Sequence, residues 1–286
     1  METGYPAVTS DKPDLPGLTG LIGQEDAAAL LCALRDGIRG VFGARLRGLY
    51  LYGSLIWGDF DPDVSDLDTM AAISDDVTER DVAALRRMHE ELVRPDLHPA
   101  YARWDDRIEV QYVPMAKLPR FREQPFLMAN ISPGEPIHLV EAGRDWLTNW
   151  YFVQTHGVTL YGLPPAEGAR TDPMLTDADF AQAVREHALS WRSYVAVTEG
   201  NVWYQAYAVL TMCRALYTLT LGGQVSKPVA AAWATGVLPE HTELIREACA
   251  VRVCKNPRQD PASFYTRVAA FVCDIANRIE GMPLPE

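Results

Sequence analysis

The chain has 286 residues, of which 48% are hydrophobic and 22% are charged, and its formal net charge is -12. This composition is sufficient for two globular domains with apolar cores and excludes a disordered chain as the default interpretation. The acidic balance also weighs against non-specific binding to nucleic acid, which needs a basic surface to neutralise many phosphates.

The cysteines are odd in number, lie far apart along the chain and show no metal-binding spacing. They are Cys32, Cys213, Cys249, Cys254 and Cys273. Reduced thiols and a cytoplasmic location are therefore expected. Residues 1–20 lack a basic region followed by an apolar one, and no apolar run reaches the roughly 18 residues of a membrane-spanning helix. We expect no secretory signal, membrane anchor or membrane partner.

The first half of the chain is predicted to alternate helices and strands. Apolar residues at helical spacing predict a helix over 24–42, and Gly43 lies at its end as a cap. The β-favouring run Leu49–Tyr52 predicts a strand that stops at Gly53-Ser54.

A loop rich in Asp, Pro and Gly follows over residues 58–65. The pattern then predicts a second strand, Asp66–Ile73, and a helix over 78–93 with Thr78 as its N-cap. A third strand is predicted over Arg107–Val113.

Glycines and prolines cluster over residues 157–173, which we interpret as a linker between two domains. The expected organisation is an N-terminal tail (1–20), a domain of mixed sheet and helices (21–163) and an all-α helical bundle (172–286). Helical apolar spacing in the second domain predicts five helices. They span residues 177–198, 203–221, 227–235, 240–253 and 262–279. The predicted fold class is therefore α+β.

Acidic residues stand at the start of the second predicted strand. Asp66 and Asp68 are two residues apart, so in a strand both carboxylates point to the same side, while Leu67 faces the core. Two adjacent carboxylates repel each other unless a cation lies between them, and hard oxygen ligands suit Mg²⁺. The spacing predicts a magnesium site.

A third acid, Glu109, lies on the predicted strand Arg107–Val113. Metal-assisted phosphoryl transfer uses such an acid either as a metal ligand or as a base that accepts the proton. The Gly53-Ser54 turn adds a place where the backbone can approach a phosphate and where a hydroxyl can donate to it.

Each of these sequence features has a simpler interpretation when it is considered alone. The Asp66–Asp68 segment would be an ordinary turn, and Glu109 an exposed residue of an edge strand. Their combination, with an apolar strand before Gly53-Ser54, favours a nucleotidyl-transfer site.

Two segments resemble known families. Gly53-Ser54 followed by Ser65-Asp66-Leu67-Asp68 resembles the signature of the polymerase-β-like nucleotidyltransferase superfamily. Residues 209–238 resemble the helical domain of aminoglycoside adenylyltransferases of the streptomycin/spectinomycin type. The resemblance covers residues 24–280 and implies a polymerase-β-like domain followed by a helical domain that completes an ATP and acceptor cleft.

The resemblance also implies an activity. Members of this family bind ATP and Mg²⁺ and transfer AMP to a hydroxyl of an aminoglycoside or aminocyclitol antibiotic, which confers resistance. Asp66 and Asp68 match the metal-binding aspartates, and Glu109 matches the acid that acts as catalytic base.

The same comparison assigns residues to the triphosphate. Ser54 and Ser65 match serines near it, and Arg214 and Lys227 match basic residues of the helical domain that reach the ATP phosphates. A surface charge is the alternative for Arg214. Lys227 opens a helix, where the helix dipole disfavours a cation, and this misplacement favours the functional interpretation.

The acceptor side matches the family pattern less closely. Trp191, Glu199 and Tyr204 are the candidate acceptor residues, and core or interdomain packing is the alternative for the aromatic ones. An ungapped match does not align Trp191 with the tryptophan of streptomycin-modifying members. We therefore favour spectinomycin over streptomycin.

Two other functions stay open. The enzyme could act on a different small hydroxylated molecule, because the acceptor depends on the shape of the cleft. Alternatively, the protein could be a catalytically quiet regulatory or antitoxin-like module, which has kept the fold but not the activity. The expected partners are ATP and a small-molecule acceptor, without nucleic acid.

Overall fold

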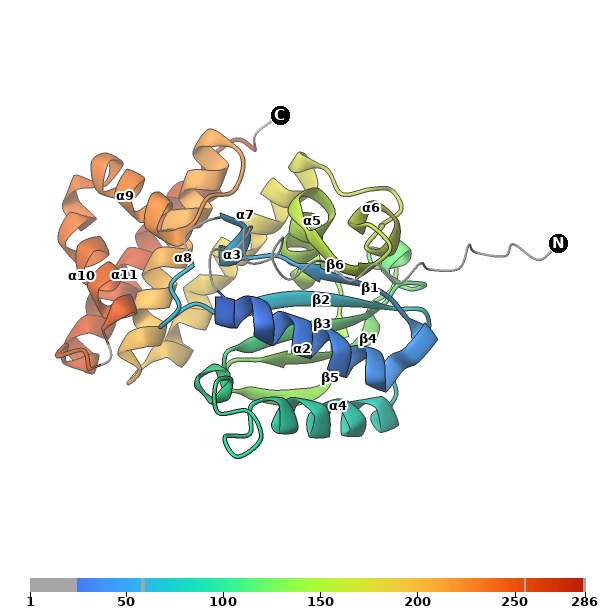
Figure 1. Cartoon of the computed structure of the whole chain (residues 1–286). Coiled ribbons are helices and arrows are strands. Elements are labelled where there is room, and N and C mark those ends of the chain that lie inside the picture. The colour runs from blue at the N-terminus through green and yellow to red at the C-terminus, as the bar shows by residue number, and fades with distance from the viewer. Residues whose placement is uncertain (1–24, 58–59, 255, 285–286) are drawn as a thin grey trace. The chain divides into compact units, whose positions relative to one another are not determined.

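The computed structural model describes residues 25–57, 60–254 and 256–284 (Figure 1). The predicted tail, 1–20, lies outside the described residues. The described chain forms two compact units, one of residues 25–57 and 66–174, the other of residues 60–65 and 175–284. That residues 21–163 and 172–286 form separate domains remains a prediction.

The first unit is built on a six-stranded sheet with the strand order β5-β4-β3-β2-β1-β6. Strands β2 and β3 pair in parallel, and the other neighbours pair antiparallel, so the predicted mixed sheet is confirmed. The strands are β1 Leu46–Leu51, β2 Leu67–Ile73, β3 Ile108–Pro114, β4 Phe126–Ser132, β5 Glu135–Ala142 and β6 Val158–Gly162.

Helices cover both faces of this sheet. Helices α2 and α4 lie together along one face, and α5 and α6 lie along the other (Figure 1). Side chains of β1 alternate accordingly, because successive residues of a strand point to opposite faces. The helices of the unit are α2 Glu25–Phe42, α3 Ser54–Trp57, α4 Glu79–Leu92, α5 Leu147–His156 and α6 Pro165–Gly168.

Helix α4 begins at the predicted cap. The hydroxyl of Thr78 accepts a hydrogen bond from the Asp81 amide at 3.2 Å, and the Asp81 carboxylate accepts one from the Thr78 amide at 2.8 Å. This reciprocal pair satisfies two amides that lack partners within the helix. Arg45 also pairs with the Asp81 carboxylate at 2.8 Å, which ties the start of α4 to the start of β1.

The interpretation of residues 157–173 as a linker is wrong for its first half. Val158–Gly162 is the edge strand β6, which pairs with β1, and Pro165–Gly168 is the short helix α6. Gly162 has a φ of 76°, and a Cβ there would lie 2.1 Å from the Arg47 carbonyl oxygen. This glycine thus permits close strand pairing, whereas the sequence pattern indicated only a break.

The second unit is helical, as predicted. Helix α8 contacts the other four helices, and its buried residues, including Val209, Met212 and Cys213, form the centre of one apolar core. The helices are α7 Asp177–Tyr194, α8 Val202–Leu221, α9 Lys227–Val237, α10 Thr242–Val253 and α11 Pro261–Glu280.

All five cysteines lie among the described residues, and none of them forms a disulfide. Two of them, Cys32 and Cys213, are buried. In the part of the chain that the structure describes, no helix has both the length and the apolar character that crossing a membrane requires.

Candidate active site

The turn after β1 brings the backbone of Gly53 against the Asp68 side chain. Gly53 has a φ of 78°, and a Cβ at this position would lie 1.9 Å from Asp68 Oδ2. The Tyr52 amide donates to the Asp68 carbonyl at 3.0 Å, which holds the turn beside β2. Ser54 follows as the first residue of α3 and is half-buried. Glycine is therefore required here both by the backbone conformation and by the neighbouring carboxylate.

The sheet places two of the predicted carboxylates side by side. Asp68 on β2 and Glu109 on β3 are direct partners in the parallel ladder, where neighbouring strands lie about 4.8 Å apart. Asp66 stands immediately before β2, which begins at Leu67 and not at Asp66 as predicted. All three acidic residues are partly exposed.

This set of groups fits a divalent metal ion. Three carboxylates on the ends of two adjacent strands supply hard oxygen ligands, and Gly53 leaves room beside one of them. Their mutual repulsion is relieved by a cation. The chemistry of this donor set suits Mg²⁺, and binding of the ion by Asp66, Asp68 and Glu109 remains a prediction.

A buried tyrosine adjoins the carboxylates. The Tyr52 hydroxyl donates to Glu109 Oε1 at 3.3 Å and accepts from Gln111 Nε2 at 2.6 Å. Burial raises the pKa of Tyr52 well above its ordinary value, and the negative charges of Glu109 and Asp68 raise it further. The hydroxyl is therefore a neutral donor.

Sequence reasoning missed Tyr52 and Gln111. The available signal was the alternation of side chains along a strand: Glu109 and Gln111 are two apart on β3, so both point to the same face. Both bond to Tyr52, which contacts Phe152 of α5, so this is the face that carries α5. A polar residue on a strand that is otherwise apolar and buried indicates a specific hydrogen bond.

Ser65 has a local structural contact. Its side chain is 4% exposed, its hydroxyl accepts from the Asp61 amide at 3.0 Å, and its amide donates to the Asp61 carbonyl at 2.7 Å. These bonds shape the turn that leads into Asp66. The predicted position of Ser65 near a triphosphate remains a prediction.

The predicted basic residues lie on two contacting helices of the second unit. Arg214 is a half-buried residue of α8, and Lys227 is the first residue of α9. The Lys227 ammonium lies 4.2 Å from the centre of the Tyr207 ring, a cation–π distance. Burial lowers the pKa of His187 on α7, and the positive charge of Arg214 lowers it further.

The three acceptor candidates lie in different surroundings. Trp191 is 1% exposed, and its indole N–H donates to His187 Nε2 at 3.0 Å. Tyr204 is half-buried, contacts the Trp191 ring and donates to the Tyr194 hydroxyl. Glu199 is exposed beyond the 3-10 turn Val195–Thr198. Trp191 thus packs in the core, and an acceptor role for these residues remains a prediction.

Among the described residues, one group of possible metal-ligand atoms that lie close together is on the helical unit. Oxygens of Glu240 and Asp274 and a nitrogen of His241 lie within 4.8 Å of one another. Arg278 already pairs with both carboxylates, at 2.6 Å and 2.9 Å, and His241 lies 2.8 Å from Asp274. This group is therefore a self-contained ion-pair network on the surface.

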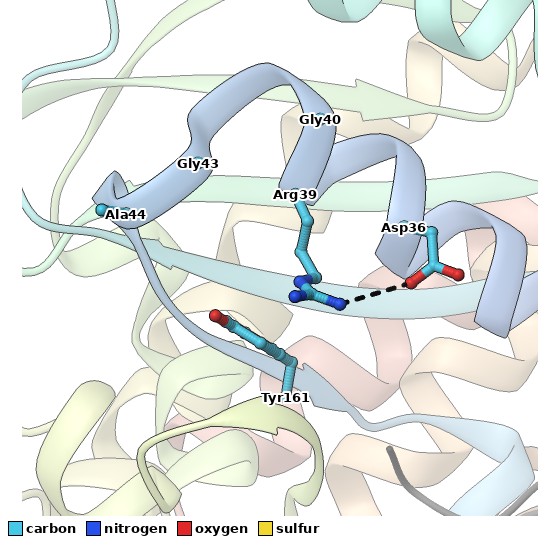
Figure 2. A pocket seen from close by; sticks show the side chains of 6 residues that line it. All are labelled: Asp36, Arg39, Gly40, Gly43, Ala44 and Tyr161. Atoms are coloured by element: carbon cyan, nitrogen blue, oxygen red, sulfur yellow. Dashed lines mark ion pairs between the residues drawn. The ribbon is translucent and has the colours of Figure 1, made fainter. Parts of the chain in front are cut away.

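A cavity of about 530 Å³ lies on the first unit, away from the carboxylates (Figure 2). Its side chains include Arg39, which extends between Asp36 and Tyr161; the guanidinium is 3.7 Å from the Asp36 carboxylate and 4.8 Å from the Tyr161 ring centre. The lining residues Gly43 and Ala44 precede β1, whereas Gly53 follows the opposite end of that strand. The lining residues are Asp36, Arg39, Gly40, Gly43, Ala44 and Tyr161.

Comparison with known proteins relates both the fold and the helical unit to characterised enzymes. Residues 173–278 match the family described as aminoglycoside adenylyltransferase, C-terminal domain. The fold is similar to the crystal structure of spectinomycin adenyltransferase AAD(9) from Enterococcus faecialis with ATP and spectinomycin. That similarity has a TM-score of 0.64 and 17% sequence identity, and it covers 88% of this chain and 98% of that chain. The predicted resemblance of the helical domain to aminoglycoside adenylyltransferases is confirmed over residues 173–278, and the predicted fold class is confirmed.

Proposed function

We propose that this protein, whose residues 173–278 match the C-terminal domain of aminoglycoside adenylyltransferases, transfers AMP from ATP to a hydroxyl of an aminoglycoside or aminocyclitol antibiotic. The observation that carries the proposal is the pairing of Asp68 with Glu109 next to the Gly53 turn. The related fold of an enzyme described with ATP and spectinomycin supports it.

Asp66 and Asp68 would hold Mg²⁺, with Glu109 as a further ligand or as the base. When bound, the ion neutralises charge on the triphosphate and lowers the pKa of the acceptor hydroxyl. Both aspartates are partly exposed, so an ion can reach them from solvent.

Glu109 would accept the proton of the acceptor hydroxyl. The acceptor oxygen then forms a bond to the α-phosphorus of ATP, the bond from that phosphorus to the bridging oxygen breaks, and pyrophosphate leaves with the bonding electrons. A carboxylate can accept such a proton, and the Tyr52 hydroxyl donates a hydrogen bond to the carboxylate of Glu109.

The remaining site residues would bind the triphosphate. The Gly53 backbone and the Ser54 hydroxyl would approach its oxygens, Ser65 would support the loop beside them, and Arg214 and Lys227 would supply positive charge. Lys227 is held over the Tyr207 ring, so its ammonium is already oriented before a nucleotide binds.

The acceptor is proposed to be spectinomycin in preference to streptomycin. The sequence departs from the pattern of streptomycin-modifying members around Trp191, and that side chain is buried in the helical core. A chain with net charge -12 attracts a cationic antibiotic. We place the reaction in the cytoplasm, where free cysteines such as these persist.

The test is pyrophosphate release from ATP and Mg²⁺ with spectinomycin, with streptomycin, or with neither. We expect release only with spectinomycin, and we expect Asp68→Asn to abolish it while circular dichroism shows an intact fold. Release with streptomycin alone would contradict the acceptor assignment. No release with either would indicate another small hydroxylated acceptor or the catalytically quiet module. Full activity of Asp68→Asn would reject the site.

A further inference from the structure

We infer that Tyr52 is a positioning residue for the base Glu109, an inference that rests on the proposed function. The Tyr52 hydroxyl donates to one carboxylate oxygen, Oε1, and this bond fixes the orientation of the carboxylate toward the acceptor hydroxyl. Tyr52 itself touches neither the nucleotide nor the acceptor in this role.

The direction of the hydrogen bonds follows from their chemistry. Gln111 Nε2 can only donate, so the Tyr52 oxygen accepts at 2.6 Å and its single proton is left for Glu109 Oε1 at 3.3 Å. Tyr52 is 5% exposed and Gln111 is 1% exposed, so water does not compete for either group. The chain Gln111–Tyr52–Glu109 therefore has one consistent direction, toward the carboxylate.

Packing fixes the Tyr52 ring. It contacts the Phe152 ring of α5 at a centroid distance of 6.2 Å, and Phe152 in turn contacts Trp57 at 5.0 Å. Phenylalanine would fill the same space, so the hydroxyl is the only part that the apolar contact does not explain. A buried hydroxyl is costly unless it is hydrogen-bonded, and here the bond is made to the proposed base.

A general base works only when one oxygen is aimed at the proton that it accepts. Glu109 is joined to its strand by a flexible side chain, and the carboxylate has two equivalent oxygens. Engaging Oε1 removes the rotations that would direct it elsewhere. Loss of the Tyr52 hydroxyl should therefore slow the chemical step and leave ATP binding intact.

The experiment compares Tyr52→Phe, Glu109→Ala and the double variant with the full-length enzyme. We expect Tyr52→Phe to lower kcat roughly tenfold with an unchanged KM for ATP, the size of one hydrogen bond to a charged group. In the Glu109→Ala background, Tyr52→Phe should produce no further loss of the residual rate, because the effect acts through that carboxylate.

The matched control is Tyr50→Phe, on the same strand. The Tyr50 side chain is fully buried, and its hydroxyl has no hydrogen-bond partner among the described residues. We expect this variant to keep kcat. Gln111→Leu, which removes the donor to Tyr52, provides a second test and should give a smaller loss in kcat than Tyr52→Phe.

A readout without turnover separates this inference from the proposed function. The changes in Tm of Tyr52→Phe and Glu109→Ala should not add in the double variant. Additive changes in Tm, or a Tyr52→Phe enzyme with wild-type kcat, would overturn the role of Tyr52. A wild-type enzyme that is inactive with every acceptor but shows non-additive changes in Tm would reject the proposed function alone.

Discussion

At the scale of single residues, the site depends on a glycine that lies against an acid. Gly53 adopts a conformation that L side chains rarely adopt, and the Asp68 carboxylate occupies the space where its Cβ would be. The sequence pattern indicated a turn that lets a phosphate approach. The structure adds that this turn also leaves room for one of the proposed metal ligands.

We predict that Gly53→Ala abolishes AMP transfer. The added Cβ would lie 1.9 Å from Asp68 Oδ2, so the carboxylate must move, and the φ of 78° adds strain of about 1 kcal/mol. Pyrophosphate release and thermal unfolding measure the two effects. The control is Gly134→Ala, which has a φ of 79° and no atom within 4 Å of the added Cβ. Equal loss of activity in both variants would contradict the clash with Asp68.

At the scale of elements, strand β3 carries proposed site residues on one face of the sheet and packs against helices with the other face. Glu109 and Gln111 face the side of the sheet that carries α5, whereas Tyr112 faces α2 and α4, where it contacts Phe42 and His89. Because alternate residues of one strand serve different faces, the same strand carries the proposed base and holds α4 in place.

We predict that His89 makes stability depend on pH. Burial lowers the pKa of His89 to about 4, and its Nε2 lies 2.7 Å from the Tyr112 hydroxyl. Between pH 6.5 and about 4, the unfolded chain binds a proton that the folded chain excludes, so stability falls as the pH falls through this range. This residue should lower the free energy of unfolding by roughly 2 kcal/mol between pH 7 and pH 5.

The measurement is urea unfolding at several pH values. His89→Gln should lose this part of the pH dependence, whereas His138→Gln, which changes an exposed histidine, should keep it. An unchanged slope in His89→Gln would show that His89 is not the group responsible.

At the scale of the whole molecule, the proposed chemistry draws on both units. The carboxylates belong to the sheet, whereas Arg214 and Lys227 belong to the helical unit that matches the adenylyltransferase family. If these assignments are correct, ATP binding depends on residues of both units.

We therefore predict that Lys227→Ala weakens ATP binding roughly tenfold or more, the loss of one charge-assisted contact to phosphate. Isothermal titration with ATP and Mg²⁺ measures the change. Lys117→Ala is the control, because Lys117 is a surface lysine that pairs with Asp76 at 2.7 Å. Wild-type affinity in Lys227→Ala, or a greater effect on the acceptor than on ATP, would contradict the assignment.

Local patterns in the sequence were sufficient to predict much of the fold. Helical spacing predicted α2 and α4 and the five helices of the second unit, and Thr78 was correctly predicted as the N-cap of α4. These features depend on residues a few positions apart, which interact whenever the local structure forms. The motif around Asp66 and Asp68 is local in the same sense.

The tertiary structure decided the features that join distant residues. Tyr52 and Glu109 are 57 positions apart, Asp68 meets Glu109 only through the pairing of β2 with β3, and β6 closes onto β1. Hydrophobic periodicity carries no information on which strands become neighbours, since pairing is set by long-range packing and chain closure. The acids were therefore predictable from the sequence, whereas the tyrosine that bonds to one of them required the fold.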